Sequence, residues 1–253
     1  MSIELITVLL FGALILLLAL GLPLAFVLGG VGVVGSYLLW GDRGLYLITT
    51  QAYASMGKFT LLAIPLFIFM AMILERAGVA DDLYTLMHRW MGPLPGGLAI
   101  GTVIICTIFA AMSGISGAAT VSMGIIALPA MLSRGYDKTI AMCCISGVGA
   151  LGILIPPSVP MILYATLTGV SIGGLFAGGI MPGLLLAAIF ILYIGIRCHF
   201  QPNLGPPLPV EERVSWREKF ISLKAVLLPI MIIIMVLGSI YAGFCTATEA
   251  SAL

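Results

Sequence analysis

Charged side chains are scarce in this sequence. Only 11 Lys+Arg and 10 Asp+Glu occur among the 253 residues, which is 8% of the chain, whereas hydrophobic residues make up 61%. Soluble domains are near half apolar and a quarter charged. Because so few charges cannot cover a water-exposed surface, a soluble globular domain is excluded and lipid is the expected solvent. The net charge of +1 gives no indication of a nucleic-acid partner.

Residues that commonly bind metals or react as thiols are also few. The chain has two histidines and five cysteines, with no CxxC pair. We interpret the cysteines as small apolar residues in helices rather than as metal or redox groups. The sequence therefore predicts neither an enzyme with catalytic residues nor a cofactor-binding protein.

Long apolar runs in which polar residues do not alternate make up much of the sequence, for example residues 3–20 and 227–237. Barrel strands would alternate apolar and polar residues over about ten positions, so helices are the remaining way to satisfy the backbone in lipid. Glu4 near the start argues against a signal peptide, and we expect the first run to be a helix of the mature protein. The predicted fold is an all-α, polytopic integral membrane protein.

About six transmembrane helices are expected, together with a re-entrant helical hairpin and a discontinuous helix. Helices are expected at about 3–20, from the Gly21–Leu22–Pro23 turn to Trp40, and at about 61–74, with a more polar stretch at 41–60 between the last two. The predicted division is 1–78 for transmembrane helices 1–3 (scaffold-like), 79–97 for an interfacial amphipathic helix and turn, 98–134 for the hairpin, 138–200 for the discontinuous helix and the helix after it (transport-domain-like), 201–224 for a cytoplasmic loop, and 225–253 for a last helix and the start of another.

The stretch after Gly78 has helical periodicity with one apolar and one polar face. Val79, Leu83, Leu86 and Trp90 lie on one face, and the charged residues take the other. About thirteen residues of this kind favour a helix in the lipid–water interface over one that crosses the bilayer.

The apolar run over 98–132 is too long for one simple span. A single helix of about 35 residues would measure roughly 52 Å, against a hydrocarbon core of about 30 Å. Its centre, Ser113–Gly114–Ile115–Ser116–Gly117, is the poorest helix-forming part. Two half-helices of about 22 Å each, folded into a re-entrant hairpin, fit these lengths.

A second interruption is predicted at Ser146–Ser158, inside an apolar stretch from Thr139 to Thr168. Three glycines and the Pro156–Pro157 pair lie within it. Pro157 has no N–H, and Pro156 disfavours the α conformation at the preceding residue. The helix is expected to end near residue 154 and to restart near Ser158.

Interrupted helices place helix ends and backbone oxygens inside the membrane, where transporters bind ions and substrates. Their N-termini, here 117–119 and 158–159, favour anions, while carbonyl and hydroxyl oxygens suit Na⁺. Ser122 and Ser146 lie in the same segments. The candidate ion- and substrate-binding residues are Ser113, Gly114, Ser116, Gly117, Thr120, Gly149, Gly152, Ile155, Pro156, Pro157 and Ser158, and the Na⁺ candidates among them are Ser113, Ser116, Gly149, Gly152 and Ser158.

Two alternatives remain open on the residues alone. Small residues also let helices approach closely, so the protein could be a structural or scaffold membrane subunit. Gly114–Ile115–Ser116–Gly117 matches the Gly-x-Ser-Gly of rhomboid-type intramembrane serine proteases, with Ser116 as the nucleophile. That chemistry needs a general base, and His88 and His199 are expected outside the membrane core. The absence of charge at the middle of the predicted helices favours a Na⁺ site over a proton relay.

Charge distribution suggests an orientation without deciding the topology. With a hairpin, nine cations (Arg76, Arg89, Arg134, Lys138, Arg197, Arg213, Arg217, Lys219 and Lys224) share one side, and only Arg43 and Lys58 lie on the other. This asymmetry predicts a cytoplasmic side. If the run over 98–132 instead crossed the bilayer as one helix, Arg76 and Arg89 would be the two cations on the minority side. The other nine cations would share the opposite side, so the split would again be nine to two.

Thr246–Ala247–Thr248–Glu249 has the pattern of a capping box that opens a helix. Because the chain ends at Leu253, inside that helix's first turn, we expect a fragment or a truncated product.

Three segments together resemble a known transporter family. They are Ser113–Gly124, Leu128–Lys138 and Gly152–Ser158, and they are similar to the large membrane (M, or DctM-type) subunit of tripartite ATP-independent periplasmic (TRAP) transporters. The resemblance extends from the first helix to the Thr–Glu–Ala near the end. It implies an elevator-type carrier of the ion transporter superfamily, with ion and substrate sites at the positions matching 113–117 and 149–158.

The resemblance also implies function and partners. It implies Na⁺-driven import of organic acids, such as C4-dicarboxylates, keto acids or sialic acid, as a multi-pass protein of the bacterial inner membrane. The implied partners are a small four-helix (Q-type) membrane subunit and a periplasmic substrate-binding protein. Ala247 stands where the family usually has proline, and the family's inverted second repeat is absent, so we expect no transport by this chain alone.

Overall fold

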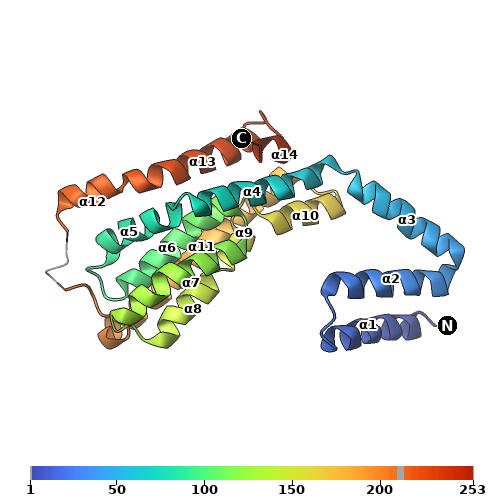
Figure 1. The fold of residues 1–253 in the computed structure, drawn as a ribbon, viewed down its shortest axis with the longest axis horizontal. Helices are drawn as coiled ribbons and strands as arrows, with labels where there is room; N and C mark the ends of the chain where they lie inside the picture. The colour runs from blue at the N-terminus through green and yellow to red at the C-terminus, as the bar shows by residue number, and fades with distance from the viewer. Residues whose placement is uncertain (1, 210–213, 253) are drawn as a thin grey trace. The chain divides into compact units, whose positions relative to one another are not determined.

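The computed structural model describes residues 2–209 and 214–252, and within these residues the regular structure is helical, as predicted (Figure 1). The α-helices are α1 (Ile3–Ala19), α2 (Leu24–Trp40), α3 (Asp42–Met56), α4 (Ala63–Arg76), α5 (Val79–Met91), α6 (Gly97–Ser113), α7 (Ser116–Ser133), α8 (Lys138–Val148), α9 (Leu151–Leu154), α10 (Val159–Thr168), α11 (Ile172–Phe200), α12 (Trp216–Ser222), α13 (Lys224–Tyr241) and α14 (Ala247–Ala250). Short 3₁₀ turns, η1 (Phe59–Leu62) and η2 (Pro202–Leu204), precede α4 and follow α11.

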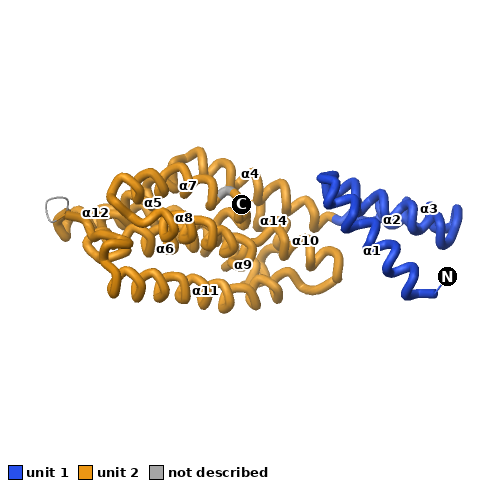
Figure 2. Tube along the Cα trace, turned by 90° about the horizontal axis from the view of Figure 1, so that it is seen from below, with its two compact units in different colours: residues 1–58 blue, residues 59–253 orange. Residues whose placement is uncertain are grey.

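The chain forms two compact units, residues 1–58 and 59–253, coloured separately in Figure 2. The first unit contains α1, α2 and α3. The predicted turn at Gly21–Leu22–Pro23 is confirmed, and Gly21 has a left-handed φ of +81°. The predicted polar stretch at 41–60 is instead largely the helix α3, which begins after Gly41 (φ +61°) and carries Asp42 in its first turn. This helix was not predicted, because its polar residues interrupt the apolar run.

The unit boundary at 58/59 differs from the predicted division at residue 78. The predicted third helix corresponds to η1 and α4, which pack with α6, α7, α10 and α14 in the second unit. The assignment of scaffold-like and transport-like roles to the blocks stays a prediction.

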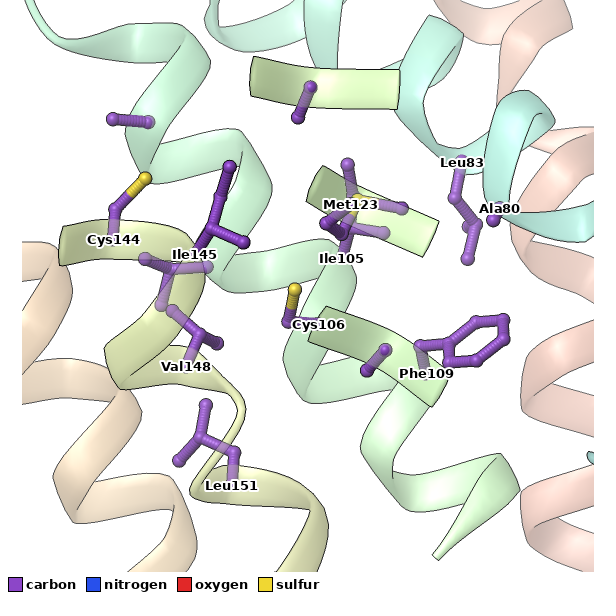
Figure 3. Close-up of a cluster of buried hydrophobic side chains, with 14 of the residues drawn as sticks. Ala80, Leu83, Ile105, Cys106, Phe109, Met123, Cys144, Ile145, Val148 and Leu151 are labelled. Carbon is purple, nitrogen blue, oxygen red and sulfur yellow. The ribbon is translucent and has the colours of Figure 1, made fainter. Parts of the chain in front are cut away.

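Helix α5 lies antiparallel along α6. A Cβ added at Gly97 would collide with the Met91 carbonyl, and one at Gly101 would lie 3.0 Å from the Met87 Cβ. At the other end of α5, Ala80 and Leu83 lie beside Phe109 (Figure 3). The amphipathic helix itself is confirmed, but its apolar face is buried against α6. The position of α5 relative to lipid stays a prediction.

The hairpin is confirmed: the run over 98–132 is interrupted between α6 and α7. Its arms have 17 and 18 residues, or about 26 and 27 Å, because the turn consumes only two residues. At the base, the Leu98 N–H donates to the Tyr136 hydroxyl oxygen at 3.2 Å. Burial raises the pKa of Tyr136 to about 12, so the phenol stays neutral at physiological pH.

The discontinuous helix is also confirmed, with its main break where it was predicted. Helix α9 ends at Leu154, and α10 begins at Val159. The structure adds a second, smaller interruption at 149–150, between α8 and α9. Gly149 and Ala150 there keep α-type backbone angles, so this is a local offset of the helix rather than a reversal.

The last part of the chain continues with long helices. Helix α11 is continuous over 29 residues despite Pro182. The predicted loop over 201–224 contains α12, which opens with a capping box of Ser215 and Glu218. The capping box of Thr246 and Glu249 is confirmed and opens α14. The capping box of Thr246 and Glu249 was predicted from the sequence, and that of Ser215 and Glu218 was not.

Four helical stretches within the described residues are long and apolar enough to cross a membrane: 59–76, 138–168 (which includes the break), 172–200 and 216–241. The apolar helices α1, α2, α6 and α7 are shorter. Together they support a polytopic membrane protein, although two of the six predicted spans, α1 and α2, belong to the shorter class.

Most predicted majority-side cations gather at one end of the second unit. Backbone hydrogen bonds join Gly96 to Gly205, Leu208 to Gly92 and Asp137 to Leu204 there, and the Trp90 indole donates to the Lys219 carbonyl at 3.0 Å. The cations at this end are Arg89, Arg134, Lys138, Arg197, Arg217, Lys219 and Lys224. Arg76 lies away from this end, because α5 separates it by about 20 Å, and its side of the membrane stays a prediction. Arg213 lies outside the described residues.

Candidate functional site

The hairpin tip is a two-residue turn. Helix α6 ends at Ser113, Gly114 adopts a left-handed conformation (φ +63°), and Ile115 is extended before α7 begins at Ser116. Left-handed backbone is the usual way to end a helix at glycine. The poor helix formers that marked this position in the sequence therefore make the turn itself.

The break in the other helix lies against this tip. Ile155 and Ser158 are extended on either side of the Pro156–Pro157 pair, whose peptide bond is cis. The Val159 N–H donates to the Gly114 carbonyl at 3.3 Å. This amide, expected to be free for an anion, is thus used in the contact between the two interruptions.

Two glycines allow the two segments to touch backbone to backbone. A Cβ at Gly114 would collide with the Pro157 carbonyl oxygen, and one at Gly152 would lie 2.8 Å from the Ser116 Cα. At Gly149 an added Cβ would collide with the side-chain hydroxyl of Thr120. A side chain at Gly114 or Gly152 would therefore push the hairpin away from the broken helix.

Hydroxyl groups surround this contact. Ser158 donates to the Ile153 carbonyl at 2.6 Å, across the break, and Thr120 donates to the Ser116 carbonyl at 2.9 Å. Ser113 is fully buried, and its hydroxyl has no hydrogen-bond partner among the described residues. An unsatisfied buried hydroxyl costs roughly 1–3 kcal/mol, and the role of Ser113 as an ion ligand stays a prediction.

A shallow hollow of about 320 Å³ opens beside the contact. It is lined by Ser116, Gly117, Thr120 and Val121 of α7 and by Ser146, Gly149, Ala150 and Ile153 of the broken helix. Among the described residues no acidic or basic side chain lines it, so its lining there consists of hydroxyls, backbone and apolar groups.

The predicted site residues thus fall into two groups. Ser116, Gly117, Thr120 and Gly149 line the hollow. Ser113, Gly114, Gly152, Ile155, Pro156, Pro157 and Ser158 are buried at the contact between tip and break. All eleven belong to the same two interruptions, which the structure brings together; their binding of ions or substrate stays a prediction.

Some neighbours of the predicted site residues became evident only in the structure. Val121, Ala150 and Ile153 line the hollow, and helical spacing from Gly117 and Gly149 could have found the first and last. Ser122, buried on α7, donates to the Glu75 carboxylate at 2.8 Å. This places an acidic group of α4 against the hairpin, a contact that no spacing indicates, because 47 residues separate the two.

Comparison with known proteins identifies the family. Residues 11–253 match the family described as tripartite ATP-independent periplasmic transporter, DctM component. The chain is 36% identical, over its whole length, to 54% of the C4-dicarboxylate TRAP transporter large permease protein DctM of Vibrio cholerae. It is 34% identical, over 93% of its length, to 54% of the ectoine TRAP transporter large permease protein TeaC of Halomonas elongata. An isethionate TRAP transporter permease protein DctMQ of Oleidesulfovibrio alaskensis is 34% identical over 96% of this chain and 38% of its own length.

These relatives are named as permeases and not as enzymes, which argues against the serine-protease alternative for Ser116. The chain spans about half the length of the first two of these relatives. The match covers the hairpin, the broken helix and both units of the structure. This chain therefore belongs to the family of DctM-type large permease subunits of tripartite ATP-independent periplasmic transporters.

Proposed function

We propose that this chain forms one half of the transport pathway of a Na⁺-coupled importer of small organic acids. The observation that carries the proposal is the glycine-mediated contact between hairpin tip and broken helix, beside a hollow lined by hydroxyls and backbone. Transporters bind coupling ions at such interrupted helices. The buried Ser113 hydroxyl, without a partner among the described residues, supplies an oxygen for Na⁺.

The substrate class and partners follow from the family. The relatives' names specify C4-dicarboxylate, ectoine and isethionate transport, so small carboxylates, zwitterions or sulfonates are the proposed substrates. A periplasmic binding protein would deliver them, and a small four-helix Q-type subunit would accompany the chain in the bacterial inner membrane. The name DctMQ of the isethionate relative fits that pairing.

Sodium is expected to stabilise the purified chain, and Ser113→Ala is expected to remove this effect. At about ten times its Kd, Na⁺ would add about 1.4 kcal/mol, or roughly 5 °C in the unfolding midpoint. In KCl the variant should be as stable as the parent or more so, because it loses an unsatisfied buried hydroxyl. Thermal unfolding in detergent, in NaCl and KCl of equal ionic strength, measures both.

Ser133→Ala is the matched control, because Ser133 is exposed on α7, the second arm of the hairpin, and bonds the local Ala130 carbonyl. It should keep the Na⁺ effect. Equal stabilisation of the parent chain by both salts would remove the support for a sodium site at the tip.

Transport itself requires the sequence that the relatives have beyond this match. We expect a chimera, with residues 11–253 replacing the matching part of the Vibrio cholerae permease, to take up C4-dicarboxylate in a Na⁺-dependent way when its partners are present. Ser113→Ala in the chimera should lower uptake about tenfold, and Ser133→Ala should not. The chain reconstituted alone should show no uptake. Unchanged Na⁺ dependence in the Ser113 variant would favour the scaffold alternative.

A further inference from the structure

A second feature of the molecule involves the other end of α8, on the side where the cations gather. A crevice of about 350 Å³ separates α8 from α11. Its lining includes Asp137, Ile140, Cys143, Phe190, Tyr193 and Arg197. We call it the α8–α11 crevice. Most of its lining is apolar, and among the described residues its one cation is Arg197.

Arg197 also borders a second hollow of about 290 Å³, on the outer face of α11. Tyr193, Ile196, Phe200 and Gln201 complete its lining. Tyr193 is 58% exposed and Phe200 is 80% exposed. Arg197, itself exposed, therefore lines both of two largely apolar depressions on the surface of the helices.

This arrangement matches the chemistry of a phospholipid. Two apolar depressions can take acyl chains, and the guanidinium of Arg197, which lines both, can bind the phosphate bidentately. Basic pockets between membrane helices on the cytoplasmic side are typical sites for anionic headgroups. The crevice lies at the end that also holds Arg134 and Lys138, and that end is the predicted cytoplasmic side.

The acidic group in the lining, Asp137, does not oppose this assignment. Its carboxylate accepts the backbone N–H groups of Thr139, at 2.9 Å, and Ile140, at 3.2 Å. It thereby caps α8, and its charge is directed toward the positive end of that helix. We propose that the α8–α11 crevice binds an anionic phospholipid, with its phosphate on Arg197.

Native mass spectrometry of the detergent-purified chain tests this proposal. Phosphatidylglycerol and phosphatidylcholine with identical acyl chains are titrated separately. The parent chain should bind phosphatidylglycerol about fivefold more tightly, the effect of one basic residue at a membrane surface. Arg197→Gln should abolish this preference. Arg217→Gln removes the same charge at the same end from α12, outside the crevice, and should preserve it.

Two further measurements distinguish a lipid site from attraction to surface charge and from a site for free phosphate. Cys143→Phe fills the crevice without changing charge and should weaken phosphatidylglycerol binding. Soluble glycerol 3-phosphate should not compete at equal concentration. Equal losses in the Arg197 and Arg217 variants, no effect of Cys143→Phe, or effective competition by glycerol 3-phosphate would each overturn the proposal.

Discussion

Replacing Gly114 by alanine is expected to lower the unfolding midpoint of the chain by roughly 10 °C. Gly114 has φ +63°, where a side chain costs about 1–2 kcal/mol. Its Cβ would also collide with the Pro157 carbonyl, which adds about 1–3 kcal/mol of overpacking. A total near 3 kcal/mol corresponds to that shift for a chain of this size. Thermal unfolding in detergent measures it.

The neighbouring Gly117 provides the matched control. An added Cβ there meets no atom within 4 Å, and the residue lies in the first turn of α7. Gly117→Ala should be neutral or stabilise by up to about 1 kcal/mol, because alanine favours helix. If both variants lowered the midpoint equally, the hairpin tip would not be docked against the break as described.

The second large effect is expected at Phe109, in the core between α5 and α6 (Figure 3). Its side chain is 1% exposed, and Phe109→Ala should destabilise the chain by about 2–3 kcal/mol. Lipid and detergent are as apolar as the protein core, so the transfer free energy that adds to such changes in water-soluble proteins is absent here. The remaining destabilisation comes from the lost packing contacts and from the cavity. Chemical or thermal unfolding in the same detergent gives the difference.

Phe69 on α4 is 64% exposed and serves as the control. Phe69→Ala removes the same ring from a surface that detergent covers, so the change should be within about 0.5 kcal/mol. A Phe109 variant no less stable than the Phe69 variant would show that α5 does not pack along α6. The result therefore tests the packing of α5 along α6.

Local backbone chemistry made the two interruptions predictable. Gly114 and the Pro156–Pro157 pair act on their own and neighbouring residues, so their effect is visible in a short stretch of sequence. The same holds for the capping box of Thr246 and Glu249. Helix α3 was not predicted, because the membrane helices were predicted from long apolar runs and its polar residues interrupt such a run.

Contacts between distant segments were not visible in this way. The bond from Ser122 to Glu75, the packing of α5 on α6 and the crevice that contains Arg197 join residues from different helices. Their formation depends on how whole helices pack, which is set by side-chain fit along their full length. The count of cations on each side also could not distinguish the two topologies, since a hairpin and a membrane-spanning helix both give nine cations against two.

Sequence alone determined that this is a helical membrane protein and where two of its helices are interrupted, because scarce charge and the backbone preferences of glycine and proline act locally. Tertiary structure decided that the two interruptions touch. The Val159 N–H donates to the Gly114 carbonyl, and at Gly152 an added Cβ would lie 2.8 Å from the Ser116 Cα of α7. Close approach of two backbones depends on the space between them, and that space is set by the packing of the whole unit.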